Sequence, residues 1–113
     1  LLSTYADYLE GSFTATVDLD LSQEGLIDLQ ADYLASFGEE ITYLTYEAST
    51  YDAVWILANA IMEVGNNAEA VKAYLDDFPG YDGLMGSIDF DENGDPLTGH
   101  VVFTVSNGEI VVY

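Results

Sequence analysis

Hydroxyl groups, aromatic rings and one carboxylate are concentrated in a short stretch of the sequence, at Tyr43, Tyr46, Glu47, Ser49 and Tyr51. An uncharged hydrophobic segment begins two residues later, at Ala53. In α/β proteins the loops at the ends of helices and strands line the ligand cleft, where hydroxyls or a carboxylate can orient a polar solute. The stretch is therefore a candidate ligand contact. The alternative is that these tyrosines pack between helices and keep their hydroxyls in water.

A second cluster has oxygen ligands at alternate positions around a glycine, as at the opening of a calcium-binding loop: Asp89, Asp91, Asn93 and Gly94. The twelfth position of such a loop needs a bidentate glutamate, and here it is His100. Pro96 also interrupts the pattern, and the segment before it is typical of a strand. We therefore expect an acidic turn between two extended segments, with no metal site and no cofactor.

The residues needed for nucleophilic catalysis are scarce in this chain. His100 is the single histidine, no cysteine is present, and no serine lies in a nucleophile-elbow pattern. The glycines Gly80, Gly83 and Gly86 precede a strand-like segment, whereas a phosphate-binding loop leads into a helix. Carboxylates are so abundant that no pair stands out for acid and base roles. The sequence therefore predicts a protein that is not an enzyme.

The charge balance is extreme, with 21 acidic residues against the single basic residue Lys72 and a formal net charge of -20. Nucleic acids and anionic lipid surfaces are bound mainly through Lys and Arg, so neither is an expected partner. The carboxylates are spread along the chain, which favours a solvated surface whose self-repulsion salt or divalent cations relieve. An acidic interaction module for a cationic partner stays open as an alternative.

The first half of the chain alternates helix and strand signals. Leu1–Leu9 has helical spacing, and Ser12–Val17 alternates β-branched and aromatic residues as a strand does. Ser22 is the expected N-cap of the next helix, which Gly38 ends in a left-handed conformation.

Helix, strand and hairpin signals continue in the second half. Ser49 or Thr50 is expected to cap a helix over Tyr51–Val64, and Asn67 to cap one that runs to about Asp77. Ser87–Phe90 is a short candidate strand. Asn107-Gly108 joins two strand-like runs into a hairpin, Gly99–Ser106 and Glu109–Tyr113.

The Tyr51–Val64 helix is apolar on nearly every side, so other elements must cover most of its circumference. Its uncharged core, Ala53–Met62, is shorter than the roughly 20 residues needed to span a bilayer. We therefore expect a buried helix and not a membrane span.

In this order, the segments resemble the carboxyl-terminal portion of the leucine/isoleucine/valine-type solute-binding proteins, the type I periplasmic binding proteins of ABC transporters. The resemblance covers essentially the whole chain, and its two best motifs are the Tyr-Asp-Ala-Val start of a hydrophobic helix at residues 51–54 and the Gly-x-Ile-x-Phe-Asp-x-Asn-Gly-Asp-Pro run at residues 86–96.

The resemblance implies an α/β fold class: a fragment of a type I periplasmic-binding-protein fold with about three helices and a small, mostly antiparallel sheet ending in a hairpin. Family members have two lobes around a cleft. Residues 1–17 and 100–113 would belong to one lobe and residues 18–99 to the other, with hinge crossings near Asp18–Leu21 and Thr98–His100. The family places a cleft-facing residue before the Tyr-Asp-Ala helix, which makes Tyr46, Glu47 and Ser49 the implied ligand contacts.

The implied function is capture of an amino acid or similar small polar solute by hinge closure, outside the cell or in the periplasm, in a secreted or membrane-anchored protein that delivers the solute to a membrane permease. A ligand-sensing extracellular domain of a receptor is the alternative on the same fold. Because a fragment would lack the cover for its apolar helix, self-association or swapping between copies is also expected.

Overall fold

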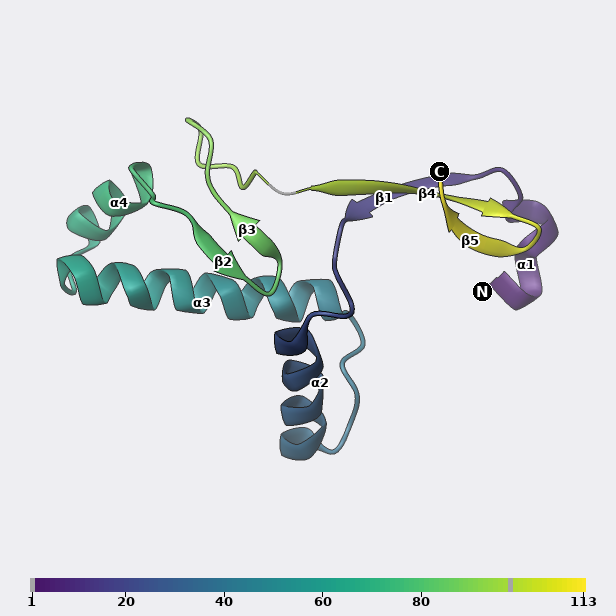
Figure 1. The fold of residues 1–113 in the computed structure, drawn as a ribbon, viewed down its shortest axis with the longest axis horizontal. Helices are drawn as coiled ribbons and strands as arrows, with labels where there is room; N and C mark the ends of the chain where they lie inside the picture. Colours follow the sequence, from purple (N-terminus) through teal and green to yellow (C-terminus); the bar gives the residue numbers. More distant parts are fainter. Residues whose placement is uncertain (1, 98) are drawn as a thin grey trace. The chain divides into compact units, whose positions relative to one another are not determined.

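The computed structural model describes residues 2–97 and 99–113. Within these ranges the chain forms four helices and five strands, in the order α1–β1–α2–α3–α4–β2–β3–β4–β5 (Figure 1). Leu1, at the start of the first expected helix, and Thr98, in one expected hinge crossing, lie outside the described residues. Four helices and small antiparallel sheets confirm the predicted class of fold.

The chain divides into two compact units. One consists of Leu1–Asp18 with Gly99–Tyr113, and the other of Leu19–Thr98. The assignment of these segments to the two lobes of a larger protein stays a prediction.

The first unit is built on an antiparallel sheet in the order β1-β4-β5, preceded by helix α1. Its elements are α1 Leu2–Leu9, β1 Phe13–Val17, β4 His100–Ser106 and β5 Glu109–Val112. The expected hairpin is confirmed: Asn107 and Gly108 both have positive φ, at 54° and 77°, as a tight two-residue turn requires. The Glu10 carboxylate accepts the N–H groups of both turn residues, at 3.0 and 3.3 Å, which ties the chain after α1 to the hairpin.

Both faces of this sheet carry exposed apolar side chains. Phe13 and Val111 lie on one face, because both are paired with Thr104 in the register, while Ile110 and Val112 lie on the other. Phe13 is 60% exposed and Val112 is 66% exposed. A sheet that is apolar on both sides is typical of one covered by further layers.

The second unit contains three helices and a small hairpin: α2 Glu24–Phe37, α3 Leu44–Val64, α4 Ala68–Asp76, β2 Tyr81–Gly83 and β3 Gly86–Ile88. As expected, Gly38 ends α2 in the left-handed conformation, and Asn67 caps α4 by accepting the N–H of Ala70 at 3.0 Å. Strand β2 is absent from the sequence predictions, because its three residues include one glycine and show too few alternations to indicate a strand.

The predicted N-cap of α2 is wrong. Gln23 precedes the first helical turn and makes no side-chain cap, whereas the backbone N–H and the hydroxyl of Ser22 both donate to Asp20 Oδ1, at 2.9 and 2.6 Å. Ser22 therefore hydrogen-bonds to the neighbouring carboxylate of Asp20 in a local turn and does not cap the helix.

The predicted start of the long hydrophobic helix is also wrong. Helix α3 begins at Leu44, and Ser49 and Thr50 lie inside it. Their hydroxyls donate back to the carbonyl oxygen of Tyr46, at 3.0 and 2.8 Å, so neither is needed as a cap. The stretch expected to be a loop is in part the first turns of this helix.

A buried carboxylate attaches α3 to the β2–β3 hairpin. Asp52, 1% exposed, accepts the N–H of Leu84 at 2.9 Å through Oδ1 and the N–H of Met85 at 2.8 Å through Oδ2. A Cβ on Gly83 would lie 2.5 Å from the carboxylate carbon, so only glycine permits this approach. Burial is the main cause that raises the pKa of the Tyr81 hydroxyl, and the negative charge of Asp52 raises it further.

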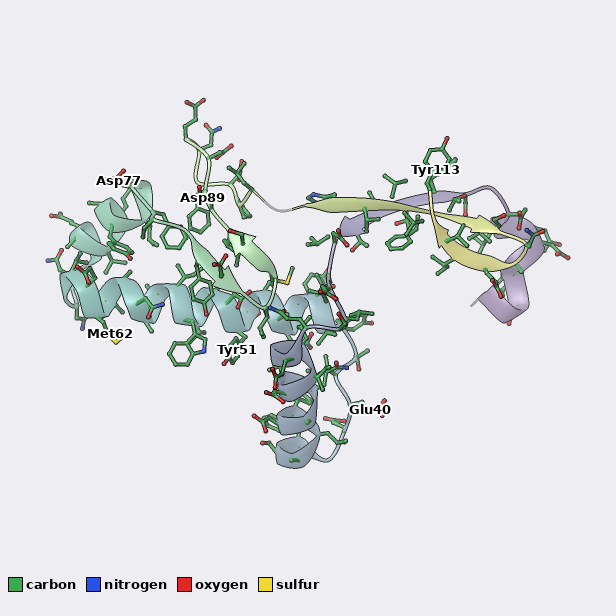
Figure 2. The ribbon with its side chains drawn as sticks, in the orientation of Figure 1. Glu40, Tyr51, Met62, Asp77, Asp89 and Tyr113 are labelled. Atoms are coloured by element: carbon green, nitrogen blue, oxygen red, sulfur yellow. The ribbon has the colours of Figure 1, made fainter. Side chains whose placement is uncertain are left out.

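Helix α3 is covered on one side only. Its buried residues recur every four positions and form one stripe: Ala48, Asp52, Ile56 and Ala60. Val54 is 62% exposed, Trp55 45% and Met62 72%. Figure 2 shows Tyr51 and Met62 on the side of α3 that faces away from the hairpin. The cover that the sequence requires for this face is not supplied by the described residues.

We predict that Asp52→Ala lowers the free energy of unfolding by about 2–4 kcal/mol, because it leaves two hairpin N–H groups without a charged acceptor. Asp28→Ala, an exposed carboxylate on α2, is the matched control and should change stability by no more than about 0.5 kcal/mol. Urea unfolding followed by circular dichroism measures both. Equal effects of the two substitutions would show that the Asp52 contact does not stabilise this unit.

Candidate ligand-binding site

An open groove of about 510 Å³ runs between helices α2 and α3. It is lined mainly by apolar and aromatic side chains, from α2 by Leu29 and Tyr33 and from α3 by Tyr46, Glu47, Thr50, Tyr51, Val54 and Trp55. The α3 residues form two rows with a spacing of four, the first of Tyr46, Thr50 and Val54 and the second of Glu47, Tyr51 and Trp55. Residues four apart lie above one another on one face of a helix, so these α3 residues form one continuous wall of the groove.

Tyr46 lies at the first turn of α3 and is 71% exposed. Its ring contacts that of Tyr43 edge-on, with centroids 6.2 Å apart. The two aromatic rings at this end of the groove therefore lie close together while both stay accessible to solvent.

Glu47 supplies the carboxylate of the groove. Its Oε2 atom is buried and has no hydrogen-bond partner among the described residues. A buried carboxylate oxygen without a donor is costly, and most buried polar atoms in proteins find a partner. This atom is therefore a buried polar position in the wall of the groove that lacks a hydrogen-bond partner among the described residues.

Ser49 does not share this location. Its hydroxyl is engaged with the Tyr46 carbonyl, and it is not among the groove-lining residues. The structure thus brings together two of the three predicted residues, Tyr46 and Glu47. The α2 residues of the groove were missed because sequence spacing does not report which helices meet. The second α3 row could have been found by extending the helical period back through residue 47.

The groove contains no basic side chain. The sole lysine, Lys72, lies on α4 and forms an exposed ion pair with Asp76, one turn further along that helix. The carboxylate of Glu47 therefore sets the sign of the charge in the groove.

The acidic cluster at residues 89–95 forms a turn, as expected. Asp91 accepts the N–H groups of Asn93 and Asp95 through Oδ1, at 2.8 and 2.9 Å, and Phe90 pairs with Pro96 across the turn. Both hydrogen bonds lower the pKa of the Asp91 carboxyl below its ordinary value of 3.8, and the one from the Asp95 N–H has the larger effect. Over residues 2–97 and 99–113, no group of three or more His, Asp or Glu side chains is arranged to hold a metal ion.

Among the helices in the described part of the chain, none combines the length and the apolar character needed to cross a membrane.

No family model and no curated protein matches the chain. Solved structures do. A leucine-binding protein from Thermotoga maritima is 28% identical over 93% of this chain, with a TM-score of 0.65, and the match covers 30% of that protein. An ABC transporter substrate-binding protein from Desulfitobacterium hafniense in complex with leucine is 23% identical over 98% of this chain, with a TM-score of 0.64 and 33% of that protein covered.

A third similar structure is an ABC transporter solute-binding protein from R. palustris in complex with benzoate, 14% identical over 98% of this chain and 31% of that protein, with a TM-score of 0.63. The chain spans about a third of the length of these proteins. The resemblance to part of a leucine/isoleucine/valine-type solute-binding protein is therefore confirmed, and with it the fold.

The pKa of Asp91 leads to a prediction about the acidic turn. Because its pKa is lowered on folding, the ionised carboxylate stabilises the turn above the ordinary pKa, and this contribution is lost as the pH falls through the lowered value. NMR spectra of the Asn93 and Asp95 amides should therefore shift steeply with pH only below about 4.

Asp91→Asn is the matched variant for this titration, since it keeps an oxygen acceptor but cannot ionise. It should abolish the pH-dependent shift at both amides. An unchanged titration in the variant would mean that another carboxylate controls the turn.

Proposed function

We propose that this chain is part of the solute-binding component of an ABC importer, which captures an amino acid or a similar small polar solute outside the cell or in the periplasm. The observation that carries the proposal is the likeness, over nearly the whole chain, to proteins named as leucine-binding or as ABC transporter substrate-binding proteins. These neighbours are binding proteins, which supports a role without catalysis. They do not favour a receptor sensor or an acidic module for a cationic partner.

In this proposal the chain contributes to both lobes of a larger, two-lobed protein. Residues 1–17 with 100–113 belong to one lobe and residues 18–99 to the other. The division of the chain into two compact units with boundaries after Asp18 and before Gly99 supports this assignment. Hinge closure buries the solute, and the closed form is then recognised by a membrane permease, because the solute binds the closed state with higher affinity.

The ligand contacts proposed for this chain are Tyr46, Glu47 and Ser49. Tyr46 and Glu47 line the groove, which supports their part in the proposal, and Ser49 contributes by holding the Tyr46 carbonyl. Proteins of similar fold have been solved with leucine and with benzoate, so the fold accommodates both amino acids and aromatic carboxylates.

The intact protein that contains this chain should be stabilised by its solute through mass action. At a ligand concentration of about 100 times Kd the expected gain is about 2.7 kcal/mol, which raises the melting temperature by several degrees. A thermal-shift screen with amino acids, amides and small carboxylates measures this, with Tyr46→Ala as the variant expected to weaken the response. If no solute of these classes stabilises the protein, the proposal is wrong.

We also propose that the isolated chain self-associates or swaps elements through the uncovered face of α3. The exposure of Val54, Trp55 and Met62 supports this, since a contiguous apolar face is rarely left in water. The net charge of -20 opposes it, so association should strengthen as salt shortens the Debye length from about 30 Å at 0.01 M to about 3 Å at 1 M.

Light scattering of the isolated chain at low and high salt measures the average mass. It should exceed the 12.3 kDa of the monomer, and increasingly so with salt. Met62→Glu should reduce the mass toward the monomer, whereas Leu21→Glu, at an equally exposed position outside α3, should not. A monomeric mass at every salt concentration would contradict the proposal.

A further inference from the structure

We infer that Asn93 is a site of spontaneous modification, at which the side-chain amide is lost as ammonia, and that the contacts of Asn107 protect it from the same reaction. Asparagine is a thermolabile residue, and the chain contains two Asn-Gly pairs, Asn93-Gly94 and Asn107-Gly108. The dipeptides are identical, so their surroundings in the fold decide which of them reacts. The inference does not depend on the proposed function.

The reaction takes place within the chain, with water as its co-reactant. The backbone nitrogen of Gly94 attacks Cγ of Asn93 and forms a new C–N bond, and the side-chain nitrogen leaves as ammonia with the proton of the Gly94 N–H. Water then opens the cyclic imide at one of its two carbonyl groups, which leaves aspartate or isoaspartate at position 93. Glycine favours the attack, because it has no Cβ to hinder the close approach of its backbone.

The Asn93-Gly94 pair is exposed and is held by its own turn. It follows β3 in a segment that belongs to no helix or strand (Figure 1). Asp91 accepts the N–H of Asn93 through Oδ1 at 2.8 Å and the N–H of Gly94 through its carbonyl oxygen at 3.0 Å. A Cβ on Gly94 would meet no atom within 4 Å among the described residues, its chain neighbours apart. Water therefore reaches the reacting atoms, and only local contacts oppose their rearrangement.

The Asn107-Gly108 pair is held from both sides and from the other end of the chain. It joins β4 to β5, whose terminal residues Ser106 and Glu109 are paired in the register. The carboxylate of Glu10 accepts the N–H groups of Asn107 and Gly108, at 3.0 and 3.3 Å. Gly108 is half-buried, and a Cβ on it would lie 3.4 Å from Cβ of Ala6 in α1.

These contacts predict very different rates at the two pairs. Ring closure requires the asparagine Cγ to move against the next backbone nitrogen, so the local backbone must first rearrange. The free energy of such opening ranges from near zero in exposed loops to the full stability of the fold in a paired strand. At Asn93 only a turn has to open, whereas at Asn107 the hairpin and its contact with Glu10 must open together. Modification at Asn93 also adds a carboxylate to a chain whose formal net charge is already -20.

The test is to incubate the intact protein at mildly alkaline pH and to follow both pairs by peptide mapping with mass spectrometry. In the folded protein Asn93 should react at least about tenfold faster than Asn107, and in urea, which removes the fold, the two rates should become similar. Labelling by an isoaspartate-specific methyltransferase should appear at position 93. If Asn107 reacts as fast as Asn93 in the folded protein, or if Asn93 reacts only in urea, the inference is wrong.

Two substitutions with the same loss of charge test the protection of Asn107. Glu10→Gln weakens the contact with the hairpin turn and should speed the reaction at Asn107 while leaving the rate at Asn93 unchanged. Glu63→Gln, at an exposed position in the last turn of α3, should change neither rate. Equal acceleration of both pairs by either substitution would show that net charge controls the reaction, which contradicts the inference.

Asn93→Gln identifies the product of the reaction. Its longer side chain forms the corresponding ring much more slowly, so the more acidic species that ion-exchange chromatography separates after incubation should disappear. The melting temperature of each variant before incubation confirms that it is folded. If the acidic species still forms at the same rate in Asn93→Gln, the modification lies elsewhere and the inference is wrong.

Discussion

The second unit depends on the two hydrogen bonds that the carboxylate of Asp52 accepts. It lies in the buried stripe of α3 and accepts the two turn N–H groups of the β2–β3 hairpin, at Leu84 and Met85. Removing a carboxylate from water is costly unless hydrogen bonds replace its hydration, and here two backbone donors do so. Because Gly83 has no side chain, the hairpin can approach close enough for both bonds to form.

This attachment determines which side of α3 remains available. Ala48, Asp52, Ile56 and Ala60 face the core, and the residues that precede the first three of them by one or two positions line the groove with α2. The same geometry leaves Met62 and neighbouring apolar side chains exposed. Similar proteins are about three times as long as this chain. The exposed apolar side chains on α3 and on both faces of the β1-β4-β5 sheet agree with a chain that contains only part of that fold.

The wrong helix caps in the sequence predictions have one physical cause. Ser22, Ser49 and Thr50 are good N-cap residues, but each forms a local hydrogen bond instead, to Asp20 in the first case and to the Tyr46 carbonyl in the others. The choice between these partners depends on backbone geometry within a few residues, and the energies are similar. Placing the helix start too late in turn hid the row of groove residues that begins at Glu47.

The sequence by itself determined the order of the helices and of the strands other than β2, the hairpin at Asn107-Gly108, the need to cover the hydrophobic helix and the net charge. These follow from local periodicity, turn chemistry and composition. Only the tertiary structure decided that Asp52 is buried against the hairpin, that Leu29 and Tyr33 complete the groove, and that Glu47 retains an unpartnered oxygen. Those outcomes depend on contacts between residues distant in the chain, and residue spacing carries no information about such contacts.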